Sequence, residues 1–264
     1  MRKGPEVMGA LTIKLWLAAA AAALVLAACV RTSRPIGLDE IVANNQAAVG
    51  GRANTADIRS IRIGLSMQDN GASFDAVYTA TRDGRMRIDI IVGGTRVYTE
   101  AYDGQGGWDL EKDGSVPVVD QYAAALWHGT QFPGQIFGLQ DLAANGHRLE
   151  YQGRETIEEI DYYVLKITLS DGFVTYRYIN PRTWMIERGR DFRAFHPAVD
   201  DKKTWIETVW SDYRPVDGVM RSFLSVNTDL TSGKLQATNK VTSMIINPDF
   251  DESIFARPSP PPAS

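Results

Sequence analysis

The chain has 264 residues, of which 44% are hydrophobic, and it contains three histidines and one cysteine. Its formal net charge is −4 and it has no long run of Lys and Arg, which argues against nucleic acid as a partner. A single cysteine cannot form an intramolecular disulfide, so the stability of the folded chain must come from a buried apolar core.

The stretch from Leu15 to Cys29 has the pattern of a secretory signal peptide. It is apolar throughout, follows the basic residues Arg2, Lys3 and Lys14, and ends on small residues. Its last four residues, Leu-Ala-Ala-Cys, resemble the lipobox of bacterial lipoproteins, which are cleaved just before the cysteine and carry a diacylglycerol on its thiol. Cysteine suits this role because a thiolate is nucleophilic enough to accept the lipid near neutral pH.

These features predict a signal peptide over residues 1–28, a lipidated Cys29 and a polar tether over residues 29–37. Two other interpretations fit less well. An uncleaved transmembrane anchor needs roughly 20 apolar residues, and this stretch supplies about 15. A plain signal peptide would leave an unpaired thiol in an oxidising compartment.

The predicted location is the periplasm-facing side of the outer membrane. Lipoproteins of enteric bacteria that stay in the inner membrane carry aspartate after the lipidated cysteine, and this chain has Val30. Removal of the first 28 residues takes away three basic side chains and one acidic side chain, so the net charge becomes −6.

Residues Leu38–Val49 are the best candidate for a helix. Ile41 and Val42 follow Leu38 at helical spacing, and two acidic residues lie in the first turn, where the helix dipole favours negative charge. The Gly50-Gly51 pair is expected to end the helix. We expect an amphipathic helix that covers one side of a sheet.

From Ile58 onward, apolar residues alternate with polar ones, as in half-buried antiparallel strands. Turn dipeptides such as Asn70-Gly71 and Asp217-Gly218 separate the alternating segments. This pattern predicts a mainly β fold, a half-open antiparallel β-barrel of about 11–12 strands with an N-terminal helix. The expected strands are residues 58–67, 74–81, 85–90, 95–102, 107–111, 148–157, 162–169, 173–179, 184–192, 203–213, 219–229 and 235–246.

Residues Ser115–Gly146 interrupt the alternation with the most apolar irregular stretch after Cys29. A short helix is expected around Tyr122–Leu126, and large apolar residues then occur among glycine and proline. A connection of this length in a hairpin-linked domain usually covers or binds something. Two interpretations remain open: a plug that closes one end of the barrel, and a movable lid over an apolar cavity.

No motif for catalysis or metal binding is evident. His128, His147 and His196 have no second histidine or cysteine at ligand spacing, so we expect no metal site. The acidic residues at 249–252 lack the spacing of a calcium loop and are expected in a solvated turn. Two carboxylates facing each other across a barrel could form a hydrolase site, but the sequence demands no such pair. We expect a protein without enzymatic activity or cofactor.

One domain is expected over residues 38–258, followed by a disordered Pro-rich tail over residues 259–264. We expect it to be monomeric. An apolar interior in such a domain could hold an acyl chain, because burial of each CH₂ group is worth about 0.8 kcal/mol.

Five segments in order resemble the LolA/LolB-like superfamily of outer-membrane lipoprotein-sorting proteins. They are Leu38–Gly51, Ala101–Trp108, Tyr178–Trp184, Trp210–Met220 and Asn247–Phe255. The resemblance implies an incomplete antiparallel β-barrel, lined with apolar residues and closed by a helical lid, that binds the acyl chains of lipoproteins or similar lipids non-covalently. The protruding loop of the outer-membrane receptor of this superfamily has no match in this sequence.

We therefore expect an outer-membrane-anchored lipoprotein that binds acyl chains in lipoprotein or lipid transfer. The alternative is an envelope sensor that uses the same fold to bind a protein partner. The residues expected to form the lid are Trp127, Phe132, Ile136, Phe137 and Leu139. The residues expected to line the cavity wall are Ile63, Leu65, Met86, Ile88, Leu165 and Ile167.

A Cys29→Ala substitution tests the predicted anchor. We expect the variant to fold normally and to appear in the soluble periplasmic fraction, because the cysteine thiol is the only lipid acceptor of a lipobox. Cell fractionation followed by immunoblotting measures this, with Ser33→Ala in the predicted tether as the matched control that stays with the membranes. A Cys29→Ala variant that remains membrane-bound would overturn the prediction.

Overall fold

The computed structural model describes residues 35–111 and 114–258, and those from Gly37 onward form one compact unit. The predicted lipidation site Cys29 and the predicted tail at 259–264 lie outside the described residues. Among the residues that are described, no helix is both long enough and apolar enough to cross a lipid bilayer.

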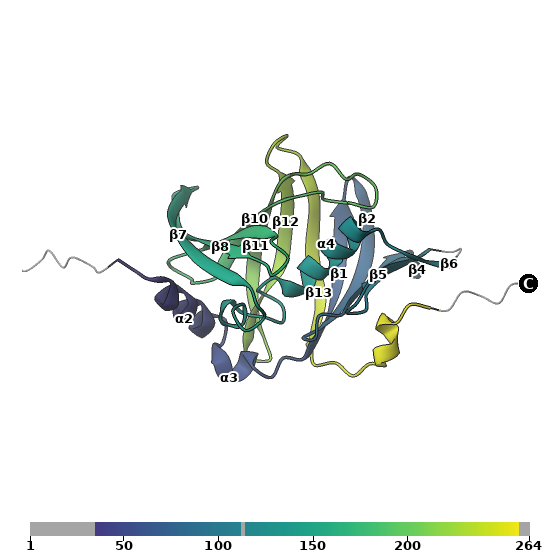
Figure 1. Cartoon of the computed structure of the whole chain (residues 1–264), viewed down its shortest axis with the longest axis horizontal. Helices are drawn as coiled ribbons and strands as arrows, with labels where there is room; N and C mark the ends of the chain where they lie inside the picture. Colours follow the sequence, from purple (N-terminus) through teal and green to yellow (C-terminus); the bar gives the residue numbers. More distant parts are fainter. Residues whose placement is uncertain (1–34, 112–113, 259–264) are drawn as a thin grey trace, which may run out of the picture. The chain divides into compact units, whose positions relative to one another are not determined.

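Thirteen strands form a single antiparallel sheet within this unit (Figure 1). The strands are β1 (Ser60–Asp69), β2 (Ala72–Thr81), β3 (Met86–Val92), β4 (Thr95–Tyr102), β5 (Gly107–Glu111), β6 (Gly114–Pro117), β7 (Arg148–Ile157), β8 (Ile160–Thr168), β9 (Val174–Ile179), β10 (Ile186–Arg193), β11 (Thr204–Val216), β12 (Val219–Asp229) and β13 (Leu235–Ile246). The helices are α2 (Leu38–Ala48), α3 (Gly51–Thr55) and α4 (Asp120–Gln131), with 3-10 turns η1 (Leu139–Asp141) and η2 (Glu252–Phe255).

The strand order is β6-β5-β4-β3-β2-β1-β13-β12-β11-β10-β9-β8-β7. Every neighbouring pair is consecutive in the chain except β1 and β13, which pair at the centre of the sheet. The edge strands β6 and β7 do not pair with each other, so the sheet is open. The prediction of a mainly β, half-open antiparallel architecture is confirmed.

The hairpin turns have the backbone conformations that their dipeptides predict. Asn70 and Gly71 have φ values of 46° and 87°, and Asp217 and Gly218 have φ values of 47° and 78°. Two successive residues with positive φ match the twist of the flanking strands, which favours Asn-Gly and Asp-Gly at these positions.

The first helix ends just before the expected glycine pair, and the other helical parts differ in detail from the expectation. Gly50 ends the first helix with φ of 120°, and a Cβ at this position would lie 2.3 Å from the carbonyl oxygen of Gly218. A second short helix, α3, then begins at once. Helix α4 runs for 12 residues and is longer than the short helix expected there. The four-residue strand β6 lies at the start of the stretch expected to be irregular.

The main core lies between one face of the sheet and the connection from β6 to β7. Ile61 and Ile63 of β1 are buried against Tyr122 and Leu126 of α4 and against Ile136 of the following loop. Helix α4 crosses this face of the sheet (Figure 1). We call the face that carries Ile61 and Ile63 the inner face, and residues 120–142 the covering segment.

Candidate functional site

A cavity of about 380 Å³ lies between the inner face and the covering segment. Its volume falls in the range of about 300–1,000 Å³ that is typical of small-molecule sites. Aliphatic, aromatic and methionine side chains form most of its lining. The polar residues of the lining are Asn45, Thr55, Tyr78, Gln135, Tyr213, Arg221, Ser222, Ser225 and Asn239. The apolar residues that line it include Val49, Ile61, Ile63, Leu65, Phe132, Ile136, Phe137, Leu139, Met185, Ile186, Trp210, Met220, Leu224, Val241 and Met244.

The central strands β1 and β13 supply the floor of this cavity. Ile63 lies directly opposite Met244, and Leu65 lies opposite Val241, so these residues share one face of the sheet. A register shift between Gly64 and Leu65 keeps both pairs on the inner face although Val241 and Met244 are three residues apart. The floor is therefore continuous and apolar across the centre of the sheet.

The wall on β11 and β12 was not expected from the sequence. Asp212 has a φ of +54° and interrupts the pairing of β11 with β12. Trp210 and Tyr213, on either side of Asp212, both line the cavity. Strict alternation would place residues three apart on opposite faces, so the periodicity of the sequence could not reveal this wall.

The roof is the loop that follows α4. It folds back on itself through a hydrogen bond from the Gly134 amide to the Phe137 carbonyl, at 2.8 Å. Gly134 has a φ of +127°, a backbone conformation that glycine adopts at low cost. This turn places Phe132, Ile136 and Phe137 over the floor.

Arg82, just after β2, fastens this roof to the sheet. Its Nη2 donates 3.1 Å hydrogen bonds to the carbonyls of Ile136 and Thr55, and its Nε donates a 2.7 Å bond to that of Ile58. Its guanidinium also lies over the Phe137 ring, at 5.1 Å from the ring centroid. One side chain thus joins the roof, α3 and the start of β1.

The C-terminal half of α4 is fixed at the opposite end of the sheet. His128 lies 2.7 Å from the Asp171 carboxylate in the β8–β9 turn and stacks on Phe173. The buried His147 ring accepts a hydrogen bond at Nδ1 from the Ser170 amide, so its Nε2 donates to Gln131. Burial lowers the pKa of His147, which agrees with this neutral form.

Two arginines lie on the inner face near the cavity, and they differ in how their charge is balanced. Arg177 is 1% exposed, forms an ion pair with Asp191 and lies under the ring of Phe132. Arg221 is 6% exposed and lines the cavity, and no carboxylate of the described residues pairs with it. Its Nη1 donates a 2.6 Å hydrogen bond to the Gly134 carbonyl.

An acidic pair lies on the inner face at the β4–β5 end of the sheet. Glu100 lies directly opposite Asp109, and Asp109 accepts a 3.4 Å hydrogen bond from Tyr98. The Tyr98 hydroxyl also lies 3.1 Å from that of Tyr122 in α4. Burial, together with the charge of Asp109, raises the pKa of Glu100 to about 7.

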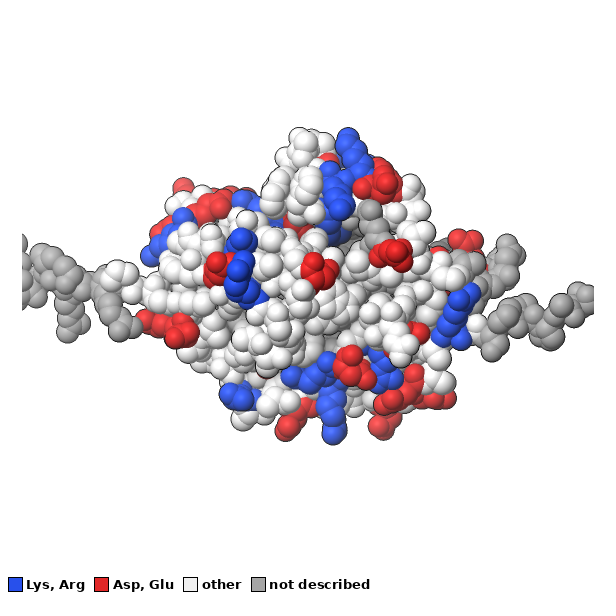
Figure 2. Space-filling view, in the orientation of Figure 1, with Lys and Arg blue, Asp and Glu red and all other residues white. Residues whose placement is uncertain are grey.

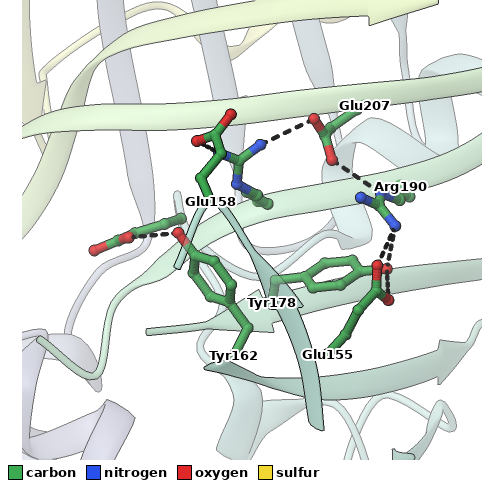
Figure 3. A network of polar contacts seen from close by, with 8 residues as sticks. Glu155, Glu158, Tyr162, Tyr178, Arg190 and Glu207 are labelled. Carbon is green, nitrogen blue, oxygen red and sulfur yellow. Dashed lines mark hydrogen bonds and ion pairs between the residues drawn. The ribbon is translucent and has the colours of Figure 1, made fainter. Parts of the chain in front are cut away.

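The outer face of β7–β11 carries a network of ion pairs (Figure 3). A Cβ added at Gly189 would point toward Arg177 and Trp210 on the inner face. Because side chains alternate along a strand, those of its neighbours Arg188 and Arg190 lie on the outer face. Arg190 donates 2.8 Å bonds to Glu207 and Glu155. Further contacts of this network are Arg188 with Glu207, Arg188 with Glu158, Arg190 with Tyr178, Tyr178 with Glu155 and Tyr162 with Glu187.

Two acidic residues of the β7–β8 hairpin take part in this network. Glu158 has a φ of 49° in the β7–β8 turn, and its carboxylate reaches Arg188 on β10. Glu155 reaches Arg190 on the same strand. These contacts span from the edge strand to the fourth strand from the edge, so they hold this end of the sheet curled.

Charged side chains are otherwise mixed over the surface. In the face shown in Figure 2, Lys and Arg lie among Asp and Glu, and no broad area of one sign is visible. Within the described residues, no group of three or more His, Cys, Asp or Glu side chains could hold a metal ion.

The residues predicted as lid and wall separate into two groups. Those that line the cavity are Ile63, Leu65, Phe132, Ile136, Phe137 and Leu139. Those outside its lining are Met86, Ile88, Trp127, Leu165 and Ile167.

The residues of the second group lie in other parts of the structure. Met86 and Ile88 pack against the main core under α4. Leu165 and Ile167 are fully buried in β8. Trp127 instead borders a smaller hollow of about 240 Å³ with Arg82 and Gln131. Which strands face free volume depends on where the covering segment lies, and this is not encoded in strand periodicity.

Comparison with known proteins shows similarity in structure but not in sequence. No protein-family model matches the chain, and no curated protein matches it in sequence. A LolA superfamily protein from Nitrosomonas europaea is similar in structure, with a TM-score of 0.54 and 13% identity over 84% of this chain and 98% of that chain.

Two further solved structures are similar. A DUF1329 family protein from Desulfovibrio piger has a TM-score of 0.53 and 13% identity, covering 81% of this chain and 96% of that chain. A domain from Vibrio parahaemolyticus, described as an outer membrane lipoprotein-sorting protein, has a TM-score of 0.53 and 11% identity over 82% and 95% of the two chains. At such identities the similarity establishes a LolA-like fold, which confirms the resemblance seen in the sequence at the level of fold.

The role of Arg82 is tested by Arg82→Met, which removes the donors to three carbonyls. We expect faster amide hydrogen exchange in residues 133–142 and a loss of about 1–3 kcal/mol of unfolding free energy, because buried acceptors lose their partners. Hydrogen-exchange mass spectrometry and urea denaturation measure the two effects. Arg85→Met is the matched control, since Arg85 contacts Asp83, Glu252 and Phe255 instead. Unchanged exchange at 133–142 in Arg82→Met would refute this role.

The raised pKa of Glu100 predicts a pH-dependent gain of stability in Glu100→Gln. The unfolded carboxyl ionises near pH 4.5 and the folded one near pH 7, so the native protein loses stability as pH rises through this interval. Above pH 7 the loss is complete, and Glu100→Gln should be more stable by on the order of 2 kcal/mol at pH 8 and unchanged at pH 4. Thermal unfolding at the two pH values measures this, with the exposed Glu111→Gln as control. An equal effect of Glu100→Gln at both pH values would contradict the prediction.

Proposed function

We propose that this protein binds the acyl chains of lipoproteins or other lipids in the cavity between the sheet and the covering segment. The observation that carries the proposal is the lining itself, in which aliphatic, aromatic and methionine side chains outnumber polar ones around about 380 Å³ of free volume. Apolar cavities of this kind favour apolar ligands because water inside them lacks polar partners.

The energetics favour such a ligand. Burial of about eight CH₂ groups contributes about 6 kcal/mol before ordering costs, without any specific polar contact. Met185, Met220 and Met244 contribute flexible thioether side chains to the lining. Methionine adapts to ligands of varied shape, which suits chains of different length and branching.

The covering segment acts as a lid in this proposal. Its roof contributes Phe132, Ile136 and Phe137 to the lining. An acyl chain that enters beneath the roof therefore lies between these side chains and the floor. The roof is joined to the sheet by a few hydrogen bonds from Arg82 and Arg221 to main-chain carbonyls. Because these bonds are few, the roof loop can move while the sheet stays folded.

The predicted lipid anchor at Cys29 completes the proposal. We place the protein in the cell envelope, attached to the outer membrane and facing the periplasm, where it takes part in lipoprotein or lipid transfer. The described lining has no carboxylate and no histidine, so it offers no acid–base pair for hydrolysis. This supports a binding role over an enzymatic one.

One observation favours the alternative of a protein partner. Phe192 and Trp205 are directly paired on β10 and β11, are 49% and 41% exposed, and have ring centroids 5.6 Å apart. Tyr176 lies next to Trp205, at 6.2 Å between ring centroids. Exposed aromatic clusters are enriched in protein interfaces.

The test of lipid binding uses the full chain purified in mild detergent from its host envelope. We expect native mass spectrometry to detect bound acyl lipid. Leu65→Trp should abolish this binding, because the indole fills the cavity floor, and should cost little stability since free volume is present. Val97→Trp, at an exposed position on β4, is the matched control.

A chain that never carries lipid, or a Leu65→Trp variant that carries as much lipid as the control, would refute the proposal. Recovery of a stoichiometric protein that is lost on Trp205→Ala would support the alternative.

A further inference from the structure

Arg221 is a buried cation without a countercharge beside an apolar cavity. It lies in β12 between Met220 and Ser222, all three of which line the cavity, and it is 6% exposed. The lining contains no other charged side chain among the described residues. A buried charge without a countercharge raises the free energy of the folded protein, and a bound anion would offset this cost.

Among the described residues, two of the three guanidinium nitrogens of Arg221 have no hydrogen-bond partner. Nη1 donates to the Gly134 carbonyl at 2.6 Å, and that neutral acceptor supplies no charge. Nε and Nη2 have no acceptor within the described residues and are closed to solvent. These two nitrogens form the parallel fork that binds both oxygens of a carboxylate or of a phosphate.

The electrostatic surroundings of Arg221 agree with this geometry. Burial alone lowers its pKa to about 10, and no neighbouring acidic group raises it. The guanidinium therefore stays protonated at neutral pH. Arg177, on the same face, shows how the fold treats a buried arginine that has its own partner, because Asp191 lies 3.4 Å from it.

We propose that Arg221 binds the anionic headgroup of an acidic lipid, a carboxylate or a phosphate monoester, whose chain occupies the cavity. This inference rests on the proposed function and specifies the class of ligand. The free edge of the guanidinium is covered in this structure, so the headgroup reaches it through a shift of the adjoining loop at Gly134. Binding of the anion satisfies Nε and Nη2 together and neutralises the buried charge.

The experiment compares two photoactivatable probes of equal chain length, a C16 fatty acid and its methyl ester, on the full chain in non-ionic detergent. We expect the acid to label peptides of the cavity at about tenfold lower concentration than the ester. Arg221→Met should reduce labelling by the acid to the level of the ester, and Arg221→Lys should restore part of the difference.

The matched control is Arg214→Met, because Arg214 lies directly opposite Arg221 on β11 but is exposed and paired with Asp212. The two probes should label Arg214→Met as they label the native protein. Thermal unfolding of each variant checks the fold. If Arg221→Met does not fold, the comparison of acid with ester on the native chain and on Arg221→Lys still decides whether Arg221 binds the headgroup.

Competition with unlabelled lysophosphatidic acid and lysophosphatidylcholine identifies the headgroup. Preferential competition by the phosphate monoester supports phosphate as the bound anion, and weak competition by both supports the carboxylate. Equal labelling by acid and ester with no effect of Arg221→Met would overturn the headgroup assignment and leave the apolar cavity function standing. Absence of cavity labelling by either probe would overturn the proposed function as well.

Discussion

A single open sheet with an apolar inner face cannot bury that face by itself, and the rest of the structure depends on how this constraint is met. Most of the cover comes from residues 120–142, which supply Tyr122 and Leu126 on one side and Ile136 and Phe137 on the other, and the N-terminal helices add Asn45, Val49 and Thr55. This cover leaves part of the space over the face unfilled. Close packing is therefore achieved over β1–β3 under α4, and free volume is left where the roof loop crosses β1, β13, β12 and β11.

Charge is used to hold the curved sheet from both sides. On the inner face, Arg82 binds carbonyls of the roof and of the segments around α3. On the outer face, Glu155 and Glu158 reach across from the edge hairpin to Arg190 and Arg188. Ion pairs between exposed partners contribute little singly, but a connected network that includes the buried Arg188 fixes geometry, because Glu207 and Glu155 each accept from two donors.

The fold was largely predictable from local sequence, whereas the cavity was not. The turn at Asn70-Gly71 and the alternation through Ile61 and Ile63 define strands because both depend on neighbouring residues. The wall at Trp210 and Tyr213 depends on the left-handed Asp212, which breaks the alternation. Arg82 and Arg221 occur in or beside strands where polar residues normally face solvent, so their inward positions follow only from tertiary packing.

Arg82 and Arg221 both hold the roof through main-chain oxygens, those of Ile136 and Gly134. Main-chain carbonyls are present whatever side chain is attached to them. The attachment of the roof is therefore insensitive to substitutions at most roof positions, provided that the tight turn with its glycine is kept. The side chains of the roof that face the cavity, and the shape of the cavity with them, could thus change while Arg82 and Arg221 still hold the loop in place.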